Sequence, residues 1–434
     1  MIDRAADYSA LYAALFETSA SFYLLVKLEF LGHATCHALM ALIWLTLLLL
    51  SILQASIVVS QTQIPLKNKA KFNAYYFNTT ITSYMEERSI PGLSVAVTYD
   101  DRLVYASGFG YADIKNKRLV DTKDRFRLAS VSKSITAVAI MYLEQTGALK
   151  VTDHVFGPTG ILGNAFGRNP YSADVLNITV QHLLEHTSGF VNEDMCGKGC
   201  DPTYLPEFLD LDQWELVGAL LDNYAPSHEP GTFASYSNFG YFIAGRVVEA
   251  ASGIYPYEKY VREEVLAKID VTDMRIALNE SRKNEVEYYD FDDPDGPYKL
   301  HVERRDSVGA WIATPIDLVR VATAIDGLSV RKNFLNKTTR AVMYDPTPVQ
   351  GSDYAKGWRV KVIDGQPIEA SKDGDYSGTN SILEINFVNK TSFAIVVNKE
   401  IPSNEQFHGG YDLKTLMDGL LADVEEWPKW DLFK

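Results

Sequence analysis

The chain has 434 residues, of which 47% are hydrophobic and 22% charged, a composition typical of a globular protein with a substantial core. Its net charge of −15 is spread along the chain without a long run of one sign, which argues against nucleic-acid binding. The sequence contains no internal repeat and no low-complexity tract.

The N-terminal segment is strongly apolar. Ala38–Val59 is almost free of polar residues and is long enough to span a bilayer. The same stretch fits a signal peptide that begins at Met40 and has its apolar core at Ala41–Leu53. In that interpretation, residues 1–39 are an upstream extension or a mistaken gene start. We therefore expect residues 1–39, a signal peptide or membrane anchor at 40–60, and one folded domain at 61–434.

Sequons and cysteines indicate the compartment. Sequons of the form N-x-S/T are glycosylated in secreted proteins, and five of them start at Asn78, Asn177, Asn279, Asn336 and Asn389. Cys196 and Cys200 enclose Gly-Lys-Gly and are predicted to form a small disulfide, with two unpaired thiols as the alternative. We expect a secreted or lumenal protein, with a single-pass type II membrane protein anchored by residues 38–59 as the alternative. The sequence contains no indication of the oligomeric state.

The predicted elements run from strands through helices and back to strands. A hairpin is predicted at 93–99 and 103–108 around Asp100-Asp101. Helices are predicted at 130–147, 179–186, 241–251 and 257–269, strands at 357–363, 381–387 and 392–398, and a last helix at 413–426. We therefore expect an α/β (α+β) fold in which strands from both chain ends form one antiparallel sheet with flanking helices. A mostly helical lobe at about 130–290 is inserted, and the natural cleft lies between the two parts.

Ser130 and Lys133 form an S-x-x-K pattern where the first long predicted helix begins. Apolar residues with helical spacing follow as far as Gly147, so this helix is predicted to be buried. The second copy, Ser329–Lys332, runs into polar residues and is predicted to be an exposed turn. Because burial disfavours the ammonium form, a lysine one turn from the serine can accept the proton of its hydroxyl. A helix cap with a lysine reaching to solvent is the alternative.

Several segments in order resemble one known superfamily. They are Ile90-Pro-Gly-Leu93, Phe126 to Lys133, Ile178 to Gly189, and Glu229-Pro-Gly231 through Tyr236-Ser-Asn238. The chain resembles the serine β-lactamase and penicillin-binding-protein superfamily, in particular its class C β-lactamase-related branch, which includes animal β-lactamase-like proteins. The resemblance covers roughly residues 90–398.

The resemblance implies a role for each motif residue. Ser130 would attack an amide or ester carbonyl, with Lys133 and Tyr236 as acid–base groups, and would carry the acyl group. Asn238 would offer its amide to the substrate and to the lysine. The implied enzyme is a metal-independent serine hydrolase without a cofactor, acting on a small-molecule or peptide amide or ester.

The third motif departs from the superfamily pattern. Lys372-Asp373-Gly374 stands where the resemblance places a K-T-G or H-x-G strand. Lys372 would orient a substrate carboxylate, and Gly374 would let the substrate backbone approach. Asp375 stands where a backbone amide would complete the oxyanion hole with the amide of Ser130. Because aspartates flank Gly374, we expect anionic substrates, including β-lactams, to bind weakly.

Two other functions remain open from the sequence. His182, Glu185 and His186 spell the H-x-x-E-H pattern of some zinc peptidases, and two histidines four residues apart on a helix share a face. The segment also matches the superfamily, in which these histidines help to build the fold. A binding or scaffold protein that retains the fold without turnover is the other alternative.

Overall fold

The computed structural model describes residues 71–198, 200–402, 409–422, 424 and 426–434. Gln61–Lys434 form one compact unit. The expected upstream extension, residues 1–39, and the signal peptide or anchor at 40–60 lie outside the described residues. Within the described ranges, no helix is both long and apolar enough to cross a membrane.

A seven-stranded antiparallel sheet forms the centre of this unit. Its strand order is β3-β2-β1-β10-β9-β8-β7. The strands are β1 (Gly92–Tyr99), β2 (Arg102–Asp113), β3 (Arg118–Leu119), β7 (Arg359–Ile363), β8 (Gln366–Tyr376), β9 (Thr379–Asn386) and β10 (Thr391–Val397). β1 from the N-terminal part pairs with β10 from the C-terminal part, with Leu93 opposite Val397. The predicted sheet built from both chain ends is confirmed.

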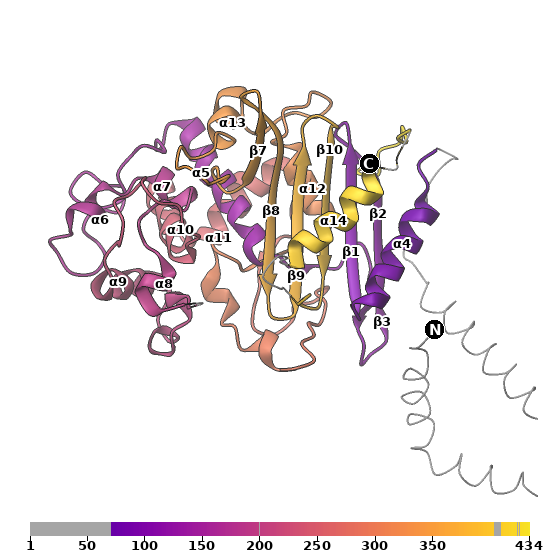
Figure 1. Ribbon diagram of the computed structural model, residues 1–434, viewed down its shortest axis with the longest axis horizontal. Coiled ribbons are helices and arrows are strands. Elements are labelled where there is room, and N and C mark those ends of the chain that lie inside the picture. Colours follow the sequence, from indigo (N-terminus) through magenta and orange to yellow (C-terminus); the bar gives the residue numbers. More distant parts are fainter. Residues whose placement is uncertain (1–70, 199, 403–408, 423, 425) are drawn as a thin grey trace, which may run out of the picture. The chain divides into compact units, whose positions relative to one another are not determined.

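Helices cover both faces of the sheet. The inner strands carry apolar side chains on both faces, and each face needs a covering layer. Leu93, Val95 and Val97 of β1 pack in one apolar cluster with α4 (Ala74–Glu87) and α14 (Gly409–Ala422). Ala96, between them, belongs to the other cluster, which includes α5 (Ser132–Thr146) and α12 (Pro315–Thr323). This alternation follows the two-residue period of a strand. Figure 1 shows α14 crossing the face of the sheet, with α4 beside it.

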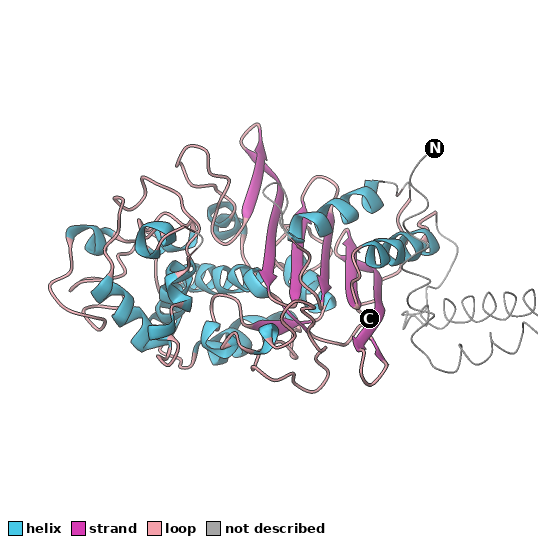
Figure 2. Cartoon of the chain, turned by 60° about the horizontal axis from the view of Figure 1, so that its bottom comes forward, coloured by secondary structure: helices cyan, strands magenta, loops and turns pink. Residues whose placement is uncertain are grey.

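The helical part lies at one end of the sheet (Figures 1 and 2). Its helices are α6 (Ala173–Asn177), α7 (Val180–Leu184), α8 (Asn192–Cys196), α9 (Gln213–Asn223), α10 (Asn238–Ser252) and α11 (Tyr257–Tyr260). After α11 the chain continues as a π-helical turn at Val261–Val265 and a 3₁₀ turn at Leu266–Ile269. A small sheet of β4 (Phe126–Arg127), β6 (Trp311–Ala313) and β5 (Arg275–Ile276) and the helix α13 (Lys337–Met343) complete the fold.

The predicted elements agree with these bounds to within a few residues, with two exceptions. The prediction of one helix at 257–269 is wrong in detail, since only its first turn is α-helical. The predicted helix at 179–186 ends earlier, at Leu184, because His186 has a φ of +59° and leaves the helix. Ser329 is exposed in an irregular loop, as predicted for the second S-x-x-K copy.

The five sequons differ in accessibility. Asn177, Asn336 and Asn389 are exposed and Asn279 is half-buried, so these four stay predictions. Asn78 is only 8% exposed, and its Oδ1 accepts a 2.7 Å hydrogen bond from the Tyr105 hydroxyl. This burial argues against a glycan on Asn78 in the folded domain, so of the five sequons Asn78 is the one least suited to carry one.

Candidate active site

Ser130 lies in a tight turn between the small sheet and α5. The turn, Ala129–Val131, is a 3₁₀ turn that runs directly into the helix. Ala129 is fully buried with a φ of +43°, a backbone conformation that is unfavourable for a residue with a Cβ. The turn is fixed at Leu128, whose N–H donates to Trp311 O and whose carbonyl accepts from Ser381 Oγ at 2.7 Å. This arrangement leaves Ser130 partly exposed beside a buried helix.

The structure brings the three predicted catalytic residues together. Lys133 Nζ lies 2.9 Å from Ser130 Oγ and 3.0 Å from Val308 O. The Tyr236 hydroxyl lies 2.7 Å from Ser130 Oγ, although 106 residues separate the two in sequence. Lys133 is 0% exposed, so the alternative of a helix-start lysine that reaches to solvent is wrong.

The electrostatic environment separates the roles of the amine and the phenol. Burial, together with the charges of Lys372 and Arg305, holds the pKa of Lys133 well below its usual value. Burial, together with Tyr354, raises the pKa of Tyr236 well above its usual value. Both shifts favour the uncharged forms, an amine that can accept a proton and a phenol that keeps one.

The histidines of the zinc pattern are used in the fold. His186 lies beyond the end of α7, and its Nδ1 accepts from Ser237 N at 3.1 Å while its ring packs 4.4 Å from the Tyr236 ring. His182 Nδ1 accepts from Thr179 N in a helix cap, and Glu185 forms a 2.6 Å ion pair with Lys356. The expectation that the two histidines share a helix face is therefore wrong. Among the described residues, no group of three potential ligands could hold a metal ion.

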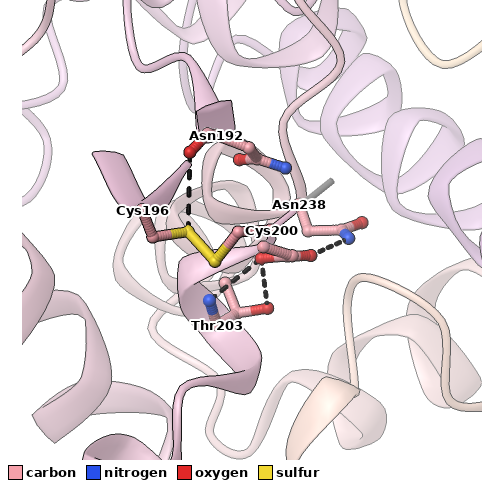
Figure 3. Close-up of a disulfide and its surroundings, with 6 residues drawn as sticks. Asn192, Cys196, Cys200, Thr203 and Asn238 are labelled. Carbon is pink, nitrogen blue, oxygen red and sulfur yellow. Dashed lines mark hydrogen bonds between the residues drawn. A yellow bond between two sulfur atoms is a disulfide. The ribbon is translucent and has the colours of Figure 1, made fainter. Parts of the chain in front are cut away.

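Asn238 has a different partner from the one expected. The predicted disulfide between Cys196 and Cys200 is formed, and the next residue, Asp201, accepts a hydrogen bond from Asn238 Nδ2 (Figure 3). In the part of the chain that the structure describes, the hydrogen-bond partners of Lys133 are Ser130 and Val308. The predicted contact of Asn238 with the lysine is therefore not formed.

Lys372 is close to the site but is already paired. Its Nζ lies 5.4 Å from the centre of the Tyr236 ring, and the residue is only 2% exposed. It donates to the carbonyl of Asp373 at 2.8 Å and forms a 3.4 Å ion pair with the Asp373 carboxylate. The cation predicted to meet a substrate carboxylate is thus compensated within the protein.

Gly374 and Asp375 bring β8 alongside the nucleophile. A Cβ at position 374 would lie 2.2 Å from Leu128 O and 3.0 Å from Ser130 N, so only glycine fits this approach. Since successive side chains alternate across a strand, Asp375 points to the face opposite Gly374. Its cross-strand neighbour is Asn380, and burial together with Asp373 raises its pKa to about 6. The Asp375 carboxylate therefore lies on the side of β8 away from Ser130.

The structure also shows residues near the site that the sequence did not indicate. A cavity of about 290 Å³ beside Tyr236 is lined by Phe233, Tyr354 and Arg359, among others. Arg359 is held by a 2.6 Å ion pair with Asp353. In the sequence, Tyr354 lies just before a predicted strand and Arg359 near the start of that strand, and nothing else distinguishes them. Asp201 had a stronger signal, because it directly follows a predicted disulfide cysteine.

Comparison with known proteins identifies relatives over most of the chain. Residues 77–416 match the protein family described as Beta-lactamase. Penicillin-binding protein 4* of Bacillus subtilis is 22% identical over 362 residues, which cover 77% of this chain and 73% of that protein.

Two solved structures share the fold. One is EstCE1, a hydrolase with promiscuous acyltransferase activity, with a TM-score of 0.63 at 20% identity, covering 80% of this chain and 98% of that one. The D-amino acid amidase from Ochrobactrum anthropi SV3 has a TM-score of 0.60 at 20% identity, with coverages of 80% and 98%. With a family match over most of the described chain and a serine, a lysine and a tyrosine in hydrogen-bond contact, this protein is a serine hydrolase and belongs to the beta-lactamase family.

Proposed function

We propose that this protein hydrolyses a carboxylic amide or ester through an acyl group on Ser130. The observation that supports this most directly is the position of Ser130 Oγ, 2.9 Å from the fully buried amine of Lys133 and 2.7 Å from the Tyr236 phenol.

Acylation uses the two neighbours in different ways. Neutral Lys133 accepts the hydroxyl proton as Ser130 Oγ attacks the carbonyl carbon, and the backbone N–H groups of Ser130 and Asp375 stabilise the oxyanion. Tyr236 gives its proton to the leaving nitrogen or oxygen when the bond to the carbonyl carbon breaks, and Lys133 returns a proton to the phenolate. Water then attacks the acyl carbon, losing its proton to the same pair, and Ser130 is released with its proton restored.

The paired state of Lys372 supports a restriction on the substrate. Because Asp373 compensates its charge at 3.4 Å, a free substrate carboxylate gains little by approaching it. The cavity beside Tyr236 combines aromatic side chains with polar ones, Arg359 and Asp353 among them, and its volume suits a group of modest size. We therefore infer that neutral esters and amides are preferred over substrates with a carboxylate next to the scissile bond, β-lactams included. The D-amino acid amidase of the same fold was crystallised in complex with L-phenylalanine amide, an amide without a carboxylate.

The branch and the location are also proposals. The order of the sequence motifs supports membership of the class C β-lactamase-related branch that includes the animal proteins. The Cys196–Cys200 disulfide supports an oxidising compartment, and hence a secreted or lumenal protein or a lumen-facing membrane protein.

Covalent labelling tests the proposal. Wild-type protein is incubated with a fluorophosphonate, with p-nitrophenyl esters, with amino-acid p-nitroanilides of both hands and with a chromogenic cephalosporin, and adducts are located by peptide mass spectrometry. We expect a fluorophosphonate adduct on Ser130 and turnover of neutral esters or amides, both absent in Ser130→Ala. Absence of any adduct in the wild type would favour the scaffold alternative, and unchanged turnover in Ser130→Ala would exclude this mechanism.

A further inference from the structure

A large basic cavity lies away from the candidate active site. It has a volume of about 990 Å³ and is formed by residues of α5 and α12, the 266–270 turn, the 330–336 loop and α13. Five cationic side chains line it, together with one carboxylate, that of Asp270; the cations are Lys268, Arg320, Arg331, Lys332 and Arg340. Such a concentration of positive charge stands out in a chain with a net charge of −15. Neither Ser130 nor Lys133 nor Tyr236 lines it.

Arg320 is the unusual member of this group. It is half-buried, and its guanidinium carbon lies 4.2 Å from the centre of the Phe433 ring. None of the described residues gives its guanidinium a hydrogen bond or an ion pair, and its nitrogens remain open to solvent. Burial and the nearby charge of Arg331 lower its pKa. Arg320 therefore has N–H donors available to an anion in the cavity, and an anion shared with Arg331 would also reduce the repulsion between the two charges.

The neighbouring cations are fixed to different extents. Arg331 stacks on the same ring at 4.5 Å, donates to Asp101 O at 2.7 Å and pairs with Asp431. Lys268 pairs with Glu264 at 2.7 Å. In the described chain, Arg340 uses only Nη1, on Leu335 O, and Lys332 is exposed without a partner. The cavity therefore combines cations that are already compensated with others that have free donors.

We propose that this cavity binds a small molecule that carries two or more phosphate groups. Arginine presents paired N–H donors that match phosphate oxygens, and several cations around one space favour several linked anionic groups. The volume exceeds what a single phosphate fills and lies within the range of small-molecule sites. The stacked rings of Tyr142 and Phe334, 4.5 Å apart on the wall, leave room for an organic group beside the phosphates.

Calorimetric titration of the full chain with inorganic triphosphate, at constant ionic strength, tests this proposal. We expect saturable one-to-one binding that weakens roughly tenfold in Arg320→Gln and in Arg340→Gln, the loss of one charge-assisted contact each. Arg168→Gln, which changes an arginine that is 88% exposed outside the cavity, is the matched control and should bind like wild type. Ser130→Ala should also bind normally, because the cavity is independent of the proposed hydrolysis.

Three results would overturn the proposal: no saturable binding, equal affinity in Arg320→Gln and Arg168→Gln, or equal affinity for citrate and triphosphate. If Arg320→Gln fails to fold, exposed Lys332→Gln supplies the same comparison. Vesicles with and without a phosphoinositide distinguish the source of the phosphates. Competition of these vesicles with triphosphate would identify a lipid headgroup as the ligand, whereas binding of triphosphate without competition identifies a soluble molecule.

A separate observation concerns the loop closed by the disulfide. Asp201 directly follows Cys200, and one of its carboxylate oxygens accepts from Asn238 Nδ2 while the other accepts from Thr203 N at 2.9 Å and Thr203 Oγ1 at 2.8 Å (Figure 3). Thr203 Oγ1 in turn accepts from the fully buried Arg305 at 3.0 Å. The carboxylate thus joins the disulfide loop to the first residue of α10, two positions after Tyr236.

We infer that Asp201 is a positioning residue for Asn238 and that the disulfide fixes Asp201 in place. This inference rests on the proposed function. A carboxylate that accepts three hydrogen bonds holds the asparagine amide in one orientation, so that its carbonyl oxygen remains directed for a substrate N–H. Opening the Cys196–Cys200 loop would release the chain next to Asp201 and loosen the same contact.

Steady-state kinetics on the ester or amide that wild type hydrolyses tests the inference. We expect Asp201→Ala to lower kcat about tenfold, Cys196→Ser to lower it less, and the double variant to be no worse than Asp201→Ala alone. Asp201→Asn, which keeps one acceptor oxygen, should recover part of the loss. Exposed Glu193→Ala, in the same loop region, is the control. Additive losses in the double variant, or a change in thermal stability with kcat unchanged, would overturn the inference. If Ser130→Ala is inactive while the Asp201 variants keep the wild-type kcat, the inference about Asp201 fails and the proposed function stands.

Discussion

Replacing Lys133 by methionine tests both the activity and the protonation state of the proposed base. Methionine has a similar length and no charge, so it fills the site without an amine. Loss of a positioned acid–base group typically lowers turnover about 10²–10⁴-fold. The hydrogen bonds that Lys133 makes with Val308 O and Ser130 Oγ are lost as well, at about 1 kcal/mol each.

The pH dependence of stability carries the sharper result. The pKa of Lys133 lies well below its ordinary value of 10.5, so between these two values the unfolded chain binds up to one proton more than the folded chain. From this lysine the folded state therefore gains stability as pH rises towards 10.5, by up to about 1.4 kcal/mol per pH unit, and methionine removes that slope. We therefore expect the free energy of unfolding of Lys133→Met minus that of wild type to become more positive as pH falls from 9.5 to 7.5, so that the variant gains stability relative to wild type.

Urea unfolding of both proteins at pH 7.5, 8.5 and 9.5, at constant salt, measures this difference. Ser130→Ala retains the lysine and should retain the wild-type slope, which separates the effect of the amine from that of lost activity. If the curves of wild type and Lys133→Met stay parallel over this range, the folded protein holds Lys133 protonated. The lysine could then not act as the base, whatever the activity of the variant.

Three further predictions concern substrate choice, pH and glycosylation. Asp373→Asn frees Lys372 and should raise the ratio of kcat/KM for carboxylate-bearing over neutral substrates roughly tenfold, measured on a matched ester pair. Burial is the main cause that raises the pKa of Asp375 to about 6 and that of Glu400 to about 7. Between pH 4 and 7 the folded chain therefore holds protons that the unfolded chain has lost, and wild type should lose stability as pH rises. In Asp375→Asn that loss should be smaller by on the order of 2 kcal/mol in urea titrations, and an identical loss would exclude this half-buried carboxylate as its source. Glycopeptide mapping after expression in a secretory host should find Asn78 unmodified even where other sequons carry glycans, and a glycan on folded Asn78 would contradict its burial.

Local patterns were sufficient to predict most of the sheet and the start of α5. The Asp100-Asp101 turn has φ values of +48° and +63°, as a two-residue hairpin turn requires, and the alternating residues on each side form β1 and β2. Ser130 and Lys133 lie three residues apart, so their contact follows from helix geometry. Tyr236 could be added only through the resemblance, because nothing in its local sequence indicates which of 25 tyrosines meets the serine.

Features set by tertiary contacts were missed. α4 was not predicted, although Phe77, Ile81 and Tyr84 have helical spacing and are buried. The partner of Asn238 depends on how the disulfide loop folds over α10, which no local pattern contains. The helix at 179–186 ends early because His186 adopts a positive φ and packs against Tyr236, again a tertiary effect.

The acidic third motif shows why residue identity alone gave an incomplete reason for the expected weak binding of anionic substrates. Two aspartates flank Gly374, and both seemed to add negative charge beside the nucleophile. Strand alternation sends both carboxylates to the face opposite Gly374, where Asp375 meets Asn380. Asp373 still acts on the site, because the long Lys372 side chain reaches back to pair with it at 3.4 Å. The proposed discrimination against anionic substrates therefore rests on one ion pair rather than on two charges, and the single change Asp373→Asn should be enough to weaken it.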